Sequence, residues 1–167
     1  MGYTVLDADT EAKKLYTLPE VKNYVLEKIS PQAYRESFVD YKLIASVIFG
    51  DDEKYEALIG FLKPLLKNIL AELLSLYSEK YIVLEAAMLF EYGLESVCDD
   101  VVCVVADKDT RAERVMLRDN CSRETFESRE RYQWPQENKI RLSDFIIKNN
   151  DNDAIIPQVE KLRLKYK

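Results

Sequence analysis

Two short, almost continuously apolar segments constrain the fold of this chain more than any other feature. Residues 81–84 and 101–106 are both rich in β-branched residues. Strands of this composition are covered on both faces, and such strands usually belong to parallel sheets. Residues 3–6 and 145–147 are further β-branched or aromatic segments, and helical stretches lie between the four. The pattern predicts an α/β fold, with a parallel sheet flanked by helices and right-handed crossovers.

Local signals also predict where helices begin. Ser30-Pro31 fits an N-cap with proline at the first helical position, and residues 17–20 fit a capping box. Asp51 or Asp52 is placed to cap a leucine-rich helix. Pro64 lies inside that helix and is expected to kink or split it.

Length and composition narrow the classes of function. The 167 residues fit one α/β domain covering residues 1–167, and 47% are hydrophobic, enough for a core. No histidine is present, which excludes Ser-His-Asp and Cys-His catalysis and His-ligated zinc. None of the four glycines precedes Lys-Ser or Lys-Thr, so the sequence has neither a G-x-x-x-x-G-K-[ST] loop nor a G-x-G-x-x-G motif.

Charge and cysteine usage indicate the compartment and exclude several partners. The net charge of -6 argues against binding to nucleic acid. No segment approaches the roughly 20 apolar residues of a membrane span, and residues 1–9 are acidic where a signal peptide is basic. Cys98, Cys103 and Cys121 form no C-x-x-C pair, so we expect reduced thiols, no direct metal site and a cytoplasmic protein.

Carboxylates follow two of the predicted strands. Asp7 and Asp9 follow the first strand, and Glu85 follows the strand at residues 81–84. Ligands bind at the carboxyl ends of strands in open parallel sheets, where an acid can orient or deprotonate a hydroxyl group. The alternative is that Asp7 or Asp9 only caps the following helix.

Arginine is concentrated in residues 111–141, which hold seven of the nine arginines. Its rigid fork suits phosphate oxygens. Arg114 and Arg118 are four residues apart and share one helix face, where they repel unless an anion lies between them. Glu113 and Asp119 can supply that anion, or a bound polyphosphate can. The segment is therefore either a solvated helical hairpin held by internal ion pairs or an anion-binding element.

In their order along the chain, these motifs resemble those of the dephospho-coenzyme A (dephospho-CoA) kinase family. The matching pieces are residues 5–9, Leu89-Phe90-Glu91, Arg114-x-x-x-Arg118-Asp119, Ser122-Arg123-Glu124, Gln133 and Ser143-Asp144-Phe145-Ile146-Ile147-x-Asn149. The resemblance implies the phosphate-loop kinase fold. It also implies transfer of the γ-phosphate of ATP, with Mg²⁺, to the ribose 3′-hydroxyl of dephospho-CoA.

The resemblance further implies a role for individual residues. Asp9 would act as general base or orienting group at the acceptor hydroxyl. The acceptor pocket would contain Asp7, Lys63, Leu89, Phe90 and Glu91, although core packing also accounts for a Leu-Phe pair. A mobile lid within residues 111–141 would bring Arg114, Arg118 and Lys139 to the ATP phosphates. Adenine would lie near Asn149, and Glu85 would help to hold Mg²⁺ through water.

The sequence departs from the family pattern at three points. The family's first strand, phosphate loop and first helix precede the motif at residues 5–9, and these pieces are expected to be absent here. Lys63-Pro64 replaces a His-Pro pair, and Tyr41 stands where an arginine is usual. We therefore expect a kinase with little or no activity, or alternatively a non-catalytic nucleotide- or CoA-binding module.

Absence of a central first strand would also leave two strands without a partner. These are the strands at residues 81–84 and 101–106, and unpaired backbone groups on a buried edge cost on the order of 1–3 kcal/mol each. We expect the two strands to pair with each other, to pair with a second copy of the chain in self-association, or to pair with upstream residues.

Overall fold

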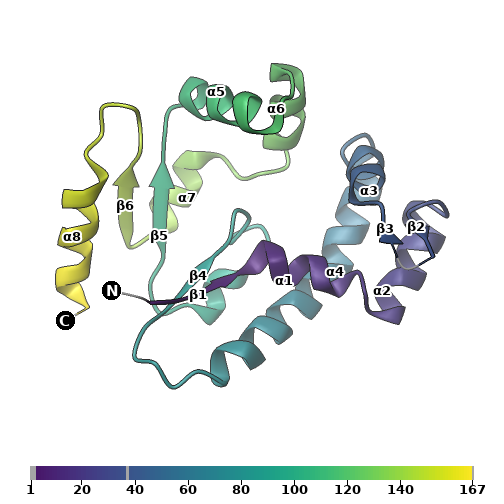
Figure 1. The fold of residues 1–167 in the computed structure, drawn as a ribbon, viewed down its shortest axis with the longest axis horizontal. Coiled ribbons are helices and arrows are strands. Elements are labelled where there is room, and N and C mark those ends of the chain that lie inside the picture. The colour runs from purple at the N-terminus through teal and green to yellow at the C-terminus, as the bar shows by residue number, and fades with distance from the viewer. Residues whose placement is uncertain (1–2, 37, 167) are drawn as a thin grey trace. The chain divides into compact units, whose positions relative to one another are not determined.

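The structure is a computed structural model that describes residues 3–36 and 38–166. It contains two compact units, Met1–Val97 and Cys98–Lys167 (Figure 1). Each unit has its own two-stranded parallel sheet with helices packed against it. The predicted α/β class is therefore confirmed, while the prediction that residues 1–167 act as one domain stays a prediction.

The first unit is built around the sheet of β1 and β4 and the long helix α4. Its elements are β1 (Thr4–Asp7), α1 (Ala8–Leu15), α2 (Pro19–Tyr24), a π-helical turn (Val25–Ile29), β2 (Tyr34–Arg35), β3 (Phe38–Val39), α3 (Tyr41–Ile48), α4 (Asp52–Ser75), β4 (Ile82–Glu85) and a 3-10 turn (Leu94–Val97).

The second unit is built around the sheet of β5 and β6. Its elements are β5 (Val102–Val105), α5 (Lys108–Asp119), α6 (Arg123–Glu130), α7 (Gln136–Leu142), β6 (Phe145–Lys148) and α8 (Ile155–Lys165). Helix α8 packs against β6, as Figure 1 shows, and α7 contacts β5.

The four predicted strands all form, each within one residue of its expected bounds. In the first sheet Leu6 is in register with Leu84, and Asp7 with Glu85. Within the described residues, β4 is hydrogen-bonded to β1 and β5 to β6, and direct pairing of β4 with β5 stays a prediction. Each of these strands already has a parallel partner in its own unit, and pairing with a second copy stays a prediction.

Helix α4 provides most of the core of the first unit. Its buried residues recur every three or four positions and are Tyr55, Leu58, Leu62, Leu66 and Leu70. This face packs against α1 and α3. Pro64 does not split the helix, which continues for 24 residues from Asp52 to Ser75 because buried leucines on both sides of the proline hold it in place. No helix in residues 3–36 and 38–166 is long and apolar enough to cross a membrane.

Two predicted helix starts are wrong because the side chains that suggested them make other hydrogen bonds. The Thr17 hydroxyl donates to the carbonyl of Lys14 at 2.7 Å, so it closes α1, and α2 begins at Pro19 without a side-chain cap. The Ser30 hydroxyl accepts the amide of Gln32 at 3.3 Å in a turn, and no helix begins there. The chain instead enters the β2–β3 hairpin, which the sequence pattern did not predict.

Candidate functional site

The carboxyl edge of the β1–β4 sheet carries two acids whose strands end together. Asp7 and Glu85 are register partners at the ends of β1 and β4. Asp7 is the N-cap of α1: Oδ1 accepts the amides of Asp9 (2.9 Å) and Thr10 (3.0 Å), and Oδ2 accepts the Thr10 hydroxyl (2.7 Å). The hydrogen bond from the Thr10 hydroxyl is the main cause that lowers the pKa of Asp7. Asp7 is therefore the residue that caps α1, and the Asp9 carboxylate remains available for another role.

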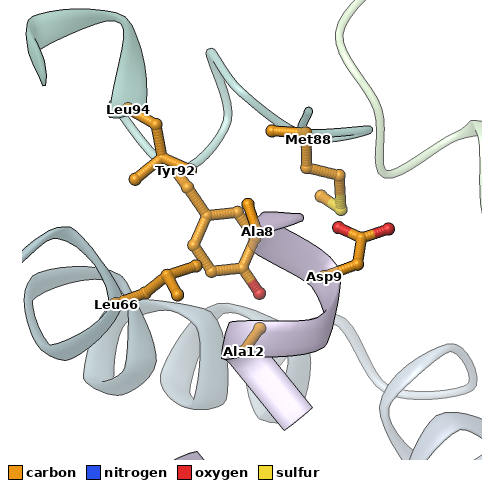
Figure 2. A pocket seen from close by; sticks show the side chains of 8 residues that line it. Ala8, Asp9, Ala12, Leu66, Met88, Tyr92 and Leu94 are labelled. Carbon is orange, nitrogen blue, oxygen red and sulfur yellow. The ribbon is translucent and has the colours of Figure 1, made fainter. Parts of the chain in front are cut away.

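Asp9 opens onto a small pocket in the first unit. The pocket has a volume of about 80 Å³ and is lined by Ala8, Asp9, Ala12, Leu66, Ala86, Met88, Tyr92 and Leu94. Figure 2 shows the Asp9 carboxylate directed toward the side chain of Met88, with the ring of Tyr92 beside Ala8. Sites for whole drug-sized ligands occupy roughly 300–1,000 Å³, so this pocket suits one end of a larger molecule.

The surroundings of this pocket raise the pKa of Asp9. Partial burial of the carboxylate raises the pKa of Asp9, the negative charge of Asp7 raises it further, and Lys13 opposes both. Burial is also the main cause that raises the pKa of Tyr92. A carboxylate with a raised pKa holds a proton more readily than an ordinary aspartate, as a general base must.

The predicted acceptor residues Leu89, Phe90 and Glu91 lie between two residues that line the pocket. Phe90 is buried in the core, Leu89 is half-buried, and Oε2 of Glu91 is shielded from solvent. Met88 and Tyr92 flank the three and line the pocket beside Asp9. Sequence reasoning missed both, although each is adjacent to the family motif. The assignment of the three inner residues to an acceptor pocket stays a prediction.

Lys63, which stands where the family pattern has histidine, packs over Gly93. An added Cβ at Gly93 would lie 3.2 Å from Cε of Lys63, and Gly93 has a φ of +67°, a conformation that other residues rarely adopt. The Lys63 ammonium group makes no hydrogen bond or ion pair within residues 3–36 and 38–166. It is therefore a half-buried cation that is available to an anionic ligand.

Tyr41, the second departure from the family pattern, braces helix α1. Its hydroxyl donates to the carbonyl of Lys13 at 3.1 Å, and its ring meets Tyr16 edge to face at 5.4 Å. These contacts fix the helix one turn after Asp9. In this structure Tyr41 therefore supports the helix that carries Asp9.

In the second unit, Arg114 binds the loop that contains Asn149. Its Nη1 donates to the Asn149 carbonyl at 2.7 Å, and its Nη2 pairs with Asp151 at 2.8 Å. The Asn149 amide in turn donates to the carbonyl of Val105 at 2.8 Å. The structure thus brings together Arg114 and Asn149, two residues predicted to contact ATP.

Ion pairs connect helices α5 and α6. Arg111 and Lys108 both contact Glu130, at 2.5 and 3.0 Å, and Arg123 contacts Asp109 at 2.6 Å. The Arg111–Glu130 pair lies within residues 111–141 and is of the kind expected for a solvated helical hairpin, while the other two pairs reach Lys108 and Asp109 just before it.

The two other phosphate-side candidates lie on different helices of this unit. Arg118, in the last turn of α5, pairs with its neighbour Asp119. Lys139 is half-buried on α7, where its charge acts on Cys103 of β5. All of the phosphate-side candidates therefore belong to the second unit, and the acceptor-side candidates to the first.

No three acidic, cysteine or histidine side chains gather into a cation site within the described part of the chain. Asp7 and Glu85 are the two acids at the sheet edge, and the carboxylate of Asp7 is engaged in capping α1. Mg²⁺ keeps several water ligands and needs only one or two carboxylates together with substrate phosphates. Glu85 is therefore compatible with a water-mediated Mg²⁺ contact.

Comparison with known proteins gives concordant matches. The model of the dephospho-CoA kinase (CoaE) family matches residues 1–154. A dephospho-CoA kinase of Fusobacterium nucleatum is 28% identical over 162 residues, which span 96% of this chain and 84% of the relative. A dephospho-CoA kinase of Thermus thermophilus is 33% identical over 148 residues, which span 89% of this chain and 71% of the relative.

Solved structures match over nearly the whole chain. TT1252 from Thermus thermophilus superposes with a TM-score of 0.80 at 31% identity, covering 99% of this chain and 85% of the other. A dephospho-CoA kinase from Campylobacter jejuni superposes with a TM-score of 0.62 at 24% identity, with coverages of 99% and 84%. The second match supports the fold alone.

Proposed function

The chain belongs to the dephospho-CoA kinase family, and on that premise we propose that it binds dephospho-CoA and directs the γ-phosphate of ATP to the ribose 3′-hydroxyl. The observation that carries the proposal is the Asp9 carboxylate. It lies at the carboxyl edge of a parallel sheet, faces a pocket, is not used for capping and has a raised pKa.

In the proposed reaction, Asp9 takes the proton of the 3′-hydroxyl. The 3′-oxygen bonds to the γ-phosphorus of ATP while the bond from that phosphorus to the bridging oxygen breaks and releases ADP. Phosphoryl transfer depends mainly on positioning and charge neutralisation, so one orienting carboxylate and several cations are suitable parts. Lys63 would bind the anionic part of the acceptor, and the residues of the Leu89–Glu91 segment would support it.

The second unit supplies the phosphate-side cations in this proposal. Arg118 and Lys139 would neutralise charge on the triphosphate, and Arg114 would hold the Asn149 loop beside the adenine. Mg²⁺, held through water by Glu85, would neutralise charge on the phosphate oxygens when it is bound with ATP. We place the reaction in the cytoplasm.

We further propose that residues 1–167 transfer phosphate slowly when they act alone. The sequence contains no Gly-Lys-Ser or Gly-Lys-Thr, and so it lacks the backbone cradle and lysine that phosphate-loop kinases use to hold the triphosphate. The same observation favours a second candidate function, a module that binds dephospho-CoA or a nucleotide without turnover.

Calorimetry together with a product assay tests these proposals. We expect the chain to bind dephospho-CoA and to form CoA from Mg²⁺-ATP at least about a thousandfold more slowly than the 1–100 s⁻¹ of typical kinases. Binding of dephospho-CoA with no CoA formed after hours would support the module. Failure to bind dephospho-CoA would contradict the kinase, and failure to bind both dephospho-CoA and ATP would contradict the module as well.

A further inference from the structure

Arg118 is held along one side of its guanidinium group by the neighbouring carboxylate. Nε of Arg118 donates to Oδ1 of Asp119 at 2.7 Å, and Nη2 donates to Oδ2 at 3.1 Å. Two parallel hydrogen bonds of this kind fix the plane of the guanidinium as well as its distance. Oδ2 also accepts a hydrogen bond from Nη1 of Arg129 at 3.1 Å.

Asp119 is itself held from two helices. It is the last residue of α5, where Asn120 ends the helix with a φ of 48°. Arg129 reaches it from α6, and only 27% of the Asp119 side chain is exposed. The carboxylate that orients Arg118 is therefore a surface group held by arginines of α5 and α6.

The end of the Arg118 guanidinium remains open. Its Nη1 has no hydrogen-bond partner within the described residues, and 73% of the side chain is exposed. Arg114 shows the opposite arrangement, because its Nη1 and Nη2 are bound to Asn149 and Asp151. Of the two arginines, only Arg118 therefore presents the Nη1–Nη2 edge that forks onto phosphate oxygens.

We propose that Asp119 is a positioning residue, which fixes Arg118 by its Nε side and directs its open end toward a phosphate group of a polyphosphate ligand. The proposal rests on the proposed function, in which Arg118 neutralises charge on the ATP triphosphate. One carboxylate between two guanidinium groups leaves one net positive charge, so the cluster still attracts an anion. Orienting Arg118 in advance lowers the entropy cost of binding.

The affinity of the Asp119→Asn variant for inorganic tripolyphosphate tests this proposal. The substitution removes one negative charge, and by charge alone it would tighten the binding of this anion. If Asp119 positions Arg118, the variant instead weakens the binding by about three- to tenfold, the size expected for the ordering of one long side chain. Asp119→Glu, which keeps the carboxylate, should recover part of the affinity.

Asp109→Asn is the matched control. Like Asp119→Asn, it removes one negative charge and an ion pair between α5 and an arginine of α6. Unlike Asp119, Asp109 makes no contact with Arg118 among the ion pairs of the described residues. We expect it to leave tripolyphosphate binding unchanged or slightly tighter. Hydrogen exchange at Nε of Arg118, measured by ¹⁵N NMR, should be faster in Asp119→Asn than in the unaltered chain. In Asp109→Asn it should not change.

Arg118→Met separates failure of this inference from failure of the proposed function. If Arg118→Met weakens tripolyphosphate binding while Asp119→Asn leaves it unchanged or tightens it, the positioning role alone is overturned. If Arg118→Met has no effect, or the unaltered chain does not bind tripolyphosphate, the phosphate role of Arg118 fails, and the positioning role fails with it.

Discussion

At the scale of single residues, side chains of the same type take different roles because their hydrogen-bond partners differ. Asp7 and Asp9 are two positions apart, yet three hydrogen bonds lower the pKa of Asp7, while burial and the charge of Asp7 raise that of Asp9. Arg114 and Arg118 are one helical turn apart; both Nη nitrogens of Arg114 are hydrogen-bonded, whereas Arg118 uses Nε and Nη2. Sequence spacing identifies these pairs as candidates, and the contacts then distinguish their members.

Lys63 provides a test of acceptor binding at this scale. Lys63→Gln should weaken dephospho-CoA binding by about tenfold, because this half-buried cation, which has no partner among the residues that the structure describes, loses its charge-assisted contact to the ligand. Lys67→Gln, one turn further along α4, is the control and should bind as the unaltered chain does. Isothermal titration calorimetry of both variants with dephospho-CoA measures the two affinities. Equal affinities would contradict the assignment of Lys63 to acceptor binding.

The charged candidates could be predicted from the sequence, and the apolar lining of the pocket could not. Asp9 follows a strand, at the end where ligands bind in parallel sheets. Arg118 shares a helix face with Arg114, four residues earlier. Both positions can be recognised from sequence spacing. Met88 and Tyr92 lie in a turn that has no periodicity, so only the path of the folded chain shows that they face Asp9.

At the scale of secondary-structure elements, local patterns predict strands and amphipathic helices well and helix caps less well. β-Branched and aromatic segments, two of them nearly continuous apolar runs, located all four parallel strands. Asp51 caps α4 as expected by accepting the Lys54 amide at 3.1 Å. Thr17 and Ser30 have several possible backbone partners within four residues, and the sequence does not rank them. The β2–β3 hairpin has strands of two residues, too short to produce a detectable alternation.

Gly60, inside α4, and Gly93, which contacts Lys63 of α4, should respond oppositely to substitution by alanine. Gly60→Ala should raise the free energy of unfolding by about 0.5–1 kcal/mol, because Gly60 is inside the helix and an added Cβ has open space. Gly93→Ala should lower it by at least about 1 kcal/mol, because of its positive φ and its contact with Lys63. Urea unfolding of both variants measures the two signs, and a stabilised Gly93→Ala would refute the close packing of Lys63.

At the scale of the whole molecule, the proposed chemistry is divided between two units. In the proposal, Met1–Val97 would carry the acid and the acceptor side, and Cys98–Lys167 the phosphate side. The order of strands and helices predicted the α/β class, and the residue motifs predicted the family. Neither predicted that β1 pairs with β4 and β5 with β6, because any pairing of these strands produces the same apolar segments.

The preference of the chain for dephospho-CoA over CoA tests the central claim most directly, because these ligands differ only by the 3′-phosphate. If Asp9 lies at the 3′-hydroxyl, its carboxylate repels that phosphate, and the unaltered chain should prefer dephospho-CoA by about tenfold or more in calorimetry. Asp9→Asn should bring the ratio of dissociation constants close to one, whereas Glu72→Gln, an exposed acid on α4, should leave it unchanged. An unaltered ratio in Asp9→Asn, or equal binding of both ligands by the unaltered chain, would contradict the account.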